Sequence, residues 1–145
     1  MTTLITDKDY YNLMKDIDTA TLENTLVKEL TDRNLKISSA ESCTGGMISQ
    51  RITNVSGASN VFELGVCSYA NRIKNKVLGV SNEILNTVGA VSQETATQMC
   101  EGIKELSSSD IGVSTTGIAG PTGGTAKKTV GLVFIGIASK ESTTI

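Results

Sequence analysis

The chain carries a short polar turn whose residue types could support nucleophilic catalysis. Residues 40–46 read AESCTGG, so two hydroxyls, a thiol and a glycine pair stand close together. Residues 35–39 before them alternate apolar and polar side chains as a strand does, and Ile48 and Ile52 after them are one helical turn apart. Free N–H groups at a helix start attract anions and can stabilise an oxyanion. Ser42 is therefore a candidate nucleophile.

The same turn has a simpler interpretation. Ser42 or Thr44 is typical of a helix N-cap, and two glycines are typical of a tight turn.

The chain has three cysteines without a C-x-x-C pair, which favours free thiols in a reducing compartment. Cys67 and Cys100 stand in apolar segments where small buried residues are ordinary. Cys43 alone stands next to a candidate site.

The chain contains no histidine, which excludes Ser-His-Asp and Cys-His mechanisms. A base must then be lysine, tyrosine, aspartate or glutamate, and Lys74 is one candidate. It could accept a proton from a serine only if its pKa fell well below the usual lysine value, which burial or a nearby cation would have to cause. Tyr69 could relay that proton or hydrogen-bond the lysine. The alternative is a solvated Lys74 and a packed Tyr69.

A second glycine-rich segment, residues 116–125, holds four glycines and the only proline. It matches neither the Walker A pattern nor the G-x-G-x-x-G pattern of dinucleotide-binding proteins. Successive N–H groups in such a loop can still bind an anion, and Lys127 and Lys128 follow closely. A flexible surface loop with solvated lysines is the alternative.

Strand-like and helix-like segments alternate along the chain, which predicts an α/β sheet covered on both faces. With two phenylalanines and no tryptophan, its core must be aliphatic. Residues 1–20 are predicted to form an N-terminal arm or short helix, and residues 21–145 a single domain. Helices are expected at 21–34, 47–52, 72–78, 82–88 and from Ser92 onward, and strands at 35–39, 110–115, 130–138 and, largely buried, at 61–69.

Charge and hydropathy exclude several classes of function. Thirteen basic and fifteen acidic residues are scattered along the chain, so no nucleic-acid partner is predicted. No apolar run is long enough to cross a membrane, and the first residues lack the features of a secretory signal. A soluble, cytoplasmic protein without a metal or other cofactor is expected.

Six stretches in register resemble the C-terminal domain of the competence/damage-inducible protein A (CinA) family, over about residues 21–138. They are AESCTGG at 40–46, GAS at 57–59, Tyr69-x-Asn71-x-x-Lys74, LGV at 78–80, GAVS at 89–92 and TGIAGP-x-GGT at 116–125. The resemblance implies a three-layer α/β/α sandwich with a mixed, mostly parallel sheet. It also implies hydrolysis of the carboxamide of nicotinamide mononucleotide, with release of ammonia, in pyridine nucleotide salvage.

Carried over by this resemblance, Ser42 is the nucleophile, Lys74 activates it and Tyr69 lies nearby. N–H groups around Thr44, Gly45 and Gly46 would hold the oxyanion, and the second loop with Lys128 would hold the ribose phosphate. The implied partner is a small nucleotide, and the oligomeric state stays open. The full set of expected substrate-binding residues is Thr44, Gly45, Gly46, Asn71, Thr116, Gly117, Gly120, Gly123, Gly124 and Lys128.

Three departures from the family pattern matter. Thr129 stands where the family usually has proline. The sequence ends at Ile145, whereas the family continues with a strand and helix that include a Gly-Asp-Arg stretch. If 145 residues is the natural length, one sheet face is expected to lack its cover. Full-length members carry a large N-terminal domain that this sequence does not include, so the chain is expected to resemble the stand-alone form. A catalytically inactive nucleotide-binding module and an interaction domain without a small ligand therefore remain alternatives.

Overall fold

The computed structural model describes residues 2–3, 15 and 21–145. Apart from β1 and Lys15, the expected N-terminal arm or helix lies outside the described residues. The elements in chain order are β1 (Thr2–Thr3), α2 (Leu22–Asp32), β2 (Ile37–Glu41), α3 (Met47–Thr53), the 3-10 helix η1 (Ala58–Asn60), β3 (Phe62–Cys67), α4 (Asn71–Leu78), α5 (Asn82–Thr87), α6 (Gln93–Ser107), β4 (Ile111–Gly117), β5 (Val133–Ala138) and β6 (Thr143–Thr144).

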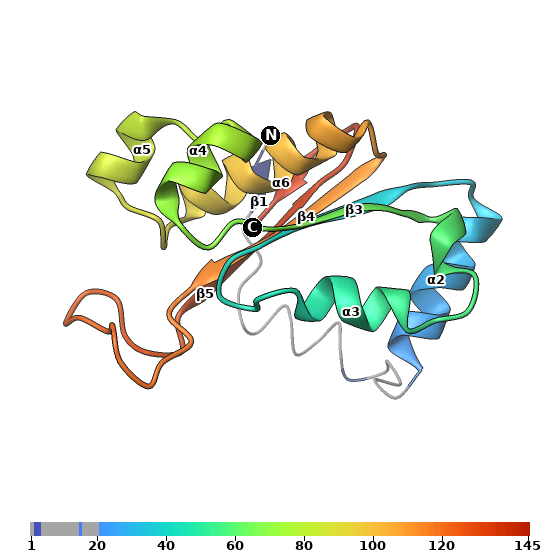
Figure 1. Ribbon diagram of the computed structural model, residues 1–145, viewed down its shortest axis with the longest axis horizontal. Coiled ribbons are helices and arrows are strands. Elements are labelled where there is room, and N and C mark those ends of the chain that lie inside the picture. The colour runs from blue at the N-terminus through green and yellow to red at the C-terminus, as the bar shows by residue number, and fades with distance from the viewer. Residues whose placement is uncertain (1, 4–14, 16–20) are drawn as a thin grey trace.

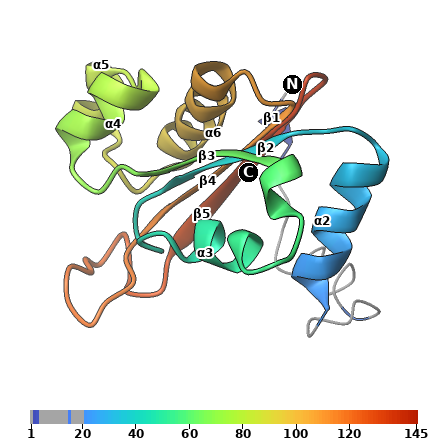
Figure 2. The same cartoon turned by 45° about the vertical axis from the view of Figure 1, so that its right-hand side comes forward.

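One mixed sheet runs through the molecule in the strand order β1-β6-β5-β4-β2-β3. Strand β2 pairs in parallel with both β3 and β4, whereas β5 is antiparallel to β4 and to β6. Helices α2 and α3 lie on one face of the sheet, and α4, α5 and α6 on the other (Figure 1). Figure 2 shows the same three layers from a second direction. The predicted α/β fold with a mixed sheet between two helical layers is confirmed.

Each helical layer encloses an aliphatic core. On one face, Val27 and Leu30 of α2 pack with Ile52 of α3 against the sheet. On the other face, Met99 and Ile103 of α6 are fully buried among residues of α4 and the connection that follows it. Burying each large aliphatic side chain contributes about 1.5–3 kcal/mol. The two cores therefore hold α3 and α4 firmly on opposite sides of β2.

Strand β3 is less buried than its sequence suggests. It lies at the edge of the sheet, and its side chains alternate between half-buried and exposed rather than being largely buried. Cys67 is consequently exposed, which corrects the expectation of a buried thiol, whereas Cys100 is buried. An edge strand packs against fewer neighbours than a central one, and a continuous apolar run does not distinguish the two.

Strand β5 carries an exposed apolar row. Gly136 and Ala138 are buried beneath α6, so the alternate side chains point to the opposite face. Those alternate side chains are 41, 53 and 45% exposed at Val133, Ile135 and Ile137. The strand begins at Val133 rather than at the expected residue 130, because Gly131 makes a turn with φ of +92°.

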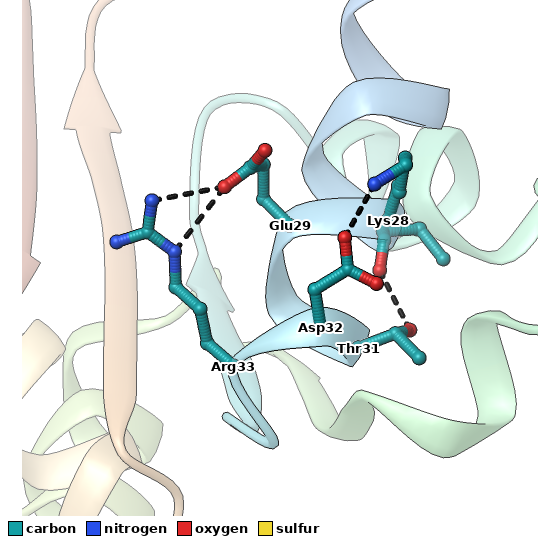
Figure 3. A network of polar contacts seen from close by, with 6 residues as sticks. Lys28, Glu29, Thr31, Asp32 and Arg33 are labelled. Atoms are coloured by element: carbon teal, nitrogen blue, oxygen red, sulfur yellow. Dashed lines mark hydrogen bonds and ion pairs between the residues drawn. The ribbon is translucent and has the colours of Figure 1, made fainter.

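Helix α2 has a charged outer surface (Figure 3). Arg33 donates to Glu29 at 2.9 Å, and Lys28 pairs with Asp32 in the same i, i+4 relation. The Thr31 hydroxyl donates to the Val27 carbonyl. Exposed pairs of this kind contribute about 0.3–0.5 kcal/mol each. The apolar face of α2, not this network, therefore supplies most of the stabilisation.

The contact between α6 and α4 leads to a first prediction. A Cβ atom at Gly102 would lie 2.0 Å from the carbonyl oxygen of Leu78, the last residue of α4. Replacing Gly102 by alanine should lower the free energy of unfolding by about 1–3 kcal/mol, although alanine favours helices. Urea denaturation measures this change. Glu105→Ala on the exposed side of α6 is the control and should stay within about 0.5 kcal/mol, and an unchanged Gly102→Ala stability would contradict the packing argument.

Candidate active site

The carboxyl ends of β2, β3 and β4 meet at one edge of the sheet, where a cavity of about 410 Å³ opens. Open α/β sheets bind ligands at this position. The chain leaves β2 at Ser42, β3 at Ser68 and β4 after Gly117. The cavity is lined by Ser42, Cys43, Tyr69, Asn71, Lys74, Ala90, Val91, Thr116, Gly117, Ile118, Ala119, Gly120, Thr122 and Gly123.

The Ser42 hydroxyl and the Lys74 amine lie within hydrogen-bonding distance at the floor of this cavity. Their Oγ and Nζ atoms are 2.9 Å apart, although 32 positions separate the two residues in the sequence. Lys74 is only 1% exposed and Ser42 only 8%. The interpretation of Lys74 as a solvated helix lysine is therefore wrong, and the two groups meet the distance requirement for a nucleophile and its base.

Two carbonyl oxygens fix the direction of the Lys74 amine. Nζ donates to the Ser68 carbonyl at 2.8 Å and to the Tyr69 carbonyl at 3.0 Å. A neutral amine has two N–H donors and one lone pair. If both donors point to these carbonyls, the lone pair faces Ser42 and can accept its proton. The Tyr69 side chain is 79% exposed, so this residue reaches the amine through its main chain.

Burial controls the protonation of the two reactive groups next to Ser42. It lowers the pKa of the Lys74 amine, because an ammonium ion is poorly solvated in the interior. It raises the pKa of the Cys43 thiol, because a thiolate is disfavoured there for the same reason. The site thus favours a neutral amine that can act as a base, and a protonated thiol that is a poor nucleophile.

Thr44, Gly45 and Gly46, the residues expected to hold the oxyanion, form the turn between β2 and α3. They do not line the cavity. The Gly46 N–H donates to the Glu41 carboxylate at 3.0 Å, and the Gly45 N–H points back to the Ser42 carbonyl at 3.3 Å. Since the Gly45 and Gly46 N–H groups already have acceptors within the turn, they are not free to hold an oxyanion in this arrangement. The oxyanion role expected of the Thr44 N–H group stays a prediction.

The second loop reaches the cavity only in part. Thr116, Gly117, Gly120 and Gly123 line it together with Asn71, but Gly124 and Lys128 do not. The Lys128 amine donates to the carbonyls of Val88 and Val91, both at 2.6 Å. It therefore fastens the loop to the segment between α5 and α6, and the contact with a ribose phosphate that the resemblance implies stays a prediction.

A family model for the CinA C-terminal domain matches residues 19–145. The chain belongs to the CinA family. It is 57% identical over 124 residues to a protein of Caldicellulosiruptor saccharolyticus named as competence-damage inducible. It is 48% identical over 126 residues to a CinA-like protein of Syntrophus aciditrophicus. These matches cover 86–87% of this chain but only 30% of either relative, so the chain spans less than a third of their length.

Solved structures agree with this assignment. The competence/damage inducible protein CihA of Agrobacterium tumefaciens is 42% identical with a TM-score of 0.81, and the match covers 83% of this chain and 73% of that one. The competence damage-inducible protein A of Klebsiella pneumoniae is 29% identical with a TM-score of 0.83, over 88% of this chain and 79% of that one. This chain thus shares its fold with both CinA-family structures, at 42% and at 29% sequence identity.

In the described part of this CinA-family chain, neither a metal-ligand cluster nor a membrane-spanning helix is found. Residues 2–3, 15 and 21–145 contain no cluster of three histidine, cysteine or carboxylate side chains that could hold a metal ion. No helix among them is long and apolar enough to cross a bilayer.

Sequence reasoning missed several residues of the CinA site. The Ser68 and Tyr69 carbonyls orient Lys74, but a carbonyl is present at every position and leaves no signal in the sequence. Ala90 and Val91 line the cavity from the connection before α6. Glu41 did carry a signal, because a charged side chain at the end of a buried strand must have partners.

The Lys128 contact generates a second prediction. Lys128→Met removes two charge-assisted hydrogen bonds, each worth about 1.5–3 kcal/mol, and should let the loop of residues 118–132 open more often. Limited proteolysis should then cut this loop faster than in the unaltered chain. Lys127→Met is a matched control, because Lys127 is the exposed neighbour. Equal cleavage rates for the two variants would contradict the fastening role.

Proposed function

We propose that this chain is a Ser-Lys amidohydrolase that converts nicotinamide mononucleotide to nicotinate mononucleotide and ammonia. The observation that carries the proposal is the 2.9 Å contact between Ser42 Oγ and the buried Lys74 Nζ, at the floor of a cavity. Histidine is absent from the chain, and the Lys74 amine is within hydrogen-bonding distance of the serine hydroxyl. The geometry supports the class of reaction, and the resemblance to CinA-family deamidases supports the choice of substrate.

The proposed reaction begins with proton transfer from the Ser42 hydroxyl to the lone pair of Lys74. The Ser42 oxygen attacks the carboxamide carbon as the proton leaves, and a tetrahedral intermediate forms. Lys74, now an ammonium ion, passes the proton to the departing nitrogen, so that ammonia leaves and an acyl-enzyme remains. Water, deprotonated by the same amine, then attacks the ester and releases the carboxylate product.

The cavity supports a small polar substrate. Its volume of about 410 Å³ lies within the range typical of small-molecule sites. Ser42 and Lys74 line the cavity, and so do Gly117, Gly120 and Gly123 from the end of β4 and the loop that follows it. Main-chain N–H groups of a glycine-rich segment can approach a phosphate closely. In our proposal the carboxamide lies at Ser42 and the phosphate lies against this loop.

Two substitutions test the proposal directly. Ser42→Ala removes the nucleophile and Lys74→Ala removes its base, so each should lower kcat for ammonia release from nicotinamide mononucleotide by at least about 10³-fold. The double variant should be no slower than either single variant, because the two residues act as a unit. Ammonia release is the measurement, and circular dichroism confirms that each variant is folded.

Cys43→Ala is the matched control for this pair. Cys43 lines the same cavity, but its raised thiol pKa makes it a poor nucleophile, so activity should stay within about threefold. An unchanged activity in Ser42→Ala, or a complete loss in Cys43→Ala, would refute the serine mechanism. Thermal stabilisation by the nucleotide without any ammonia release would instead support the inactive binding module.

The pH dependence provides a further prediction. Because burial lowers the pKa of Lys74, the fraction of neutral amine rises as pH increases through a value below its ordinary 10.5. The kcat/KM for ammonia release should therefore increase with pH through that range and then level off. Tyr69→Phe should leave the midpoint unchanged, because phenylalanine keeps the main-chain carbonyl that contacts the amine. A midpoint that moves with Tyr69→Phe would contradict the assignment of this titration to Lys74.

A further inference from the structure

Glu41 is a buried carboxylate that takes no part in lining the cavity. Its side chain is 0% exposed. Oε2 accepts a hydrogen bond from the Thr44 hydroxyl at 2.7 Å, and Oε1 accepts one from the Ser49 hydroxyl at 2.8 Å. A buried charge is tolerated only when it is paired or hydrogen-bonded. The groups that donate hydrogen bonds to the Glu41 carboxylate therefore indicate the structural role of its charge.

Three further donors to Glu41 are main-chain N–H groups at the start of α3. Gly46 and Ile48 donate to Oε2, both at 3.0 Å, and Ser49 donates to Oε1 at 2.9 Å. The first N–H groups of a helix have no partner within the helix, and Gly46 at the N-cap has no side chain to supply one. Glu41 caps α3 from the preceding strand. The turn that contains Ser42 is thus closed by a single side chain.

The main chain of Glu41 connects to the other half of the site. Its carbonyl accepts a hydrogen bond from the Ser68 N–H at 2.8 Å, and the Ser68 carbonyl in turn accepts one from the Lys74 amine. On the other side, the Ser42 N–H donates to the Thr115 carbonyl at 3.0 Å. One residue therefore contacts both the turn that carries the serine and the segment that orients the lysine.

The carboxylate of Glu41 is held in its charged form by dipoles. Burial by itself raises the pKa of the Glu41 carboxyl, but hydrogen bonds from Thr44, Ser49 and Ile48 outweigh that effect and hold the pKa below its ordinary value. All five donors point toward an acceptor-only group. A glutamine in its place would keep the shape, but its NH₂ group would face some of these donors.

We propose that Glu41 is a positioning residue that holds Ser42 at the Lys74 amine by capping α3 and closing the intervening turn. This inference rests on the proposed serine mechanism, and it adds to that mechanism a residue that does not contact the substrate. Misplacing a reacting atom by about 1 Å can cost about 10²-fold in rate. Because the cavity lining does not include Glu41, its replacement should lower kcat and leave KM nearly unchanged.

The test compares the full chain with Glu41→Gln, and with Glu63→Gln as a matched control on the exposed side of neighbouring β3. Glu41→Gln should lower kcat for ammonia release by about 10²-fold with KM within about threefold, whereas Glu63→Gln should change neither. Hydrogen exchange should accelerate at the Gly46, Ile48 and Ser49 amides of the first variant only. Thr44→Val, which removes one donor, is a milder second variant with the same expected direction in case Glu41→Gln does not fold.

Labelling of Ser42 by a fluorophosphonate separates this inference from the proposed function. Slower labelling in Glu41→Gln or Thr44→Val than in the unaltered chain would support the positioning role, even if nicotinamide mononucleotide proves not to be the substrate. An unaltered chain that releases no ammonia would refute the proposed function alone. A folded Glu41→Gln with unchanged kcat and unchanged labelling, or with a change in KM only, would overturn the inference.

Discussion

The buried amine of Lys74 is stabilised by carbonyl dipoles at Ser68 and Tyr69, and the rest of the site depends on this arrangement. Carbonyls accept hydrogen bonds from either protonation state of the amine, whereas a nearby carboxylate would strongly favour the ammonium ion. Burial then lowers the pKa of Lys74. The Ser42 hydroxyl is the third hydrogen-bonding neighbour of the Lys74 amine, after the two carbonyls. The orientation of the amine therefore follows from these contacts, and its basicity follows from the same buried position.

This arrangement requires two strands and one helix to be placed correctly at once. Ser42 follows β2, the two carbonyls follow β3, and Lys74 lies in the first half of α4. The parallel pairing of β2 with β3 brings the first two sets together, and the aliphatic core beneath α4 and α6 fixes the third. Glu41 joins them, since its side chain caps α3 and its carbonyl holds Ser68. Packing far from the cavity therefore contributes to the chemistry within it.

Many elements were predictable because local pattern determines them. The 3.6-residue spacing located α6, although Leu106 at its last turn is 51% exposed rather than packed. The strand and helix on either side of Ser42 were also expected, and both are present within two residues. The edge position of β3 and the late start of β5 were missed. Both depend on strand order and on a turn at Gly131, which periodicity does not report.

The sequence by itself determined the reactive groups: a serine in a strand-to-helix turn, a lysine in a short helix and no histidine. It also determined the family, through six stretches in register. Only the tertiary structure decided which groups meet. It placed Ser42 against Lys74, used Gly46 N–H to hold Glu41 and tied Lys128 to the carbonyls of Val88 and Val91. The physical reason is that burial and main-chain direction set the partners of a polar group, and neither is fixed until the strands pair.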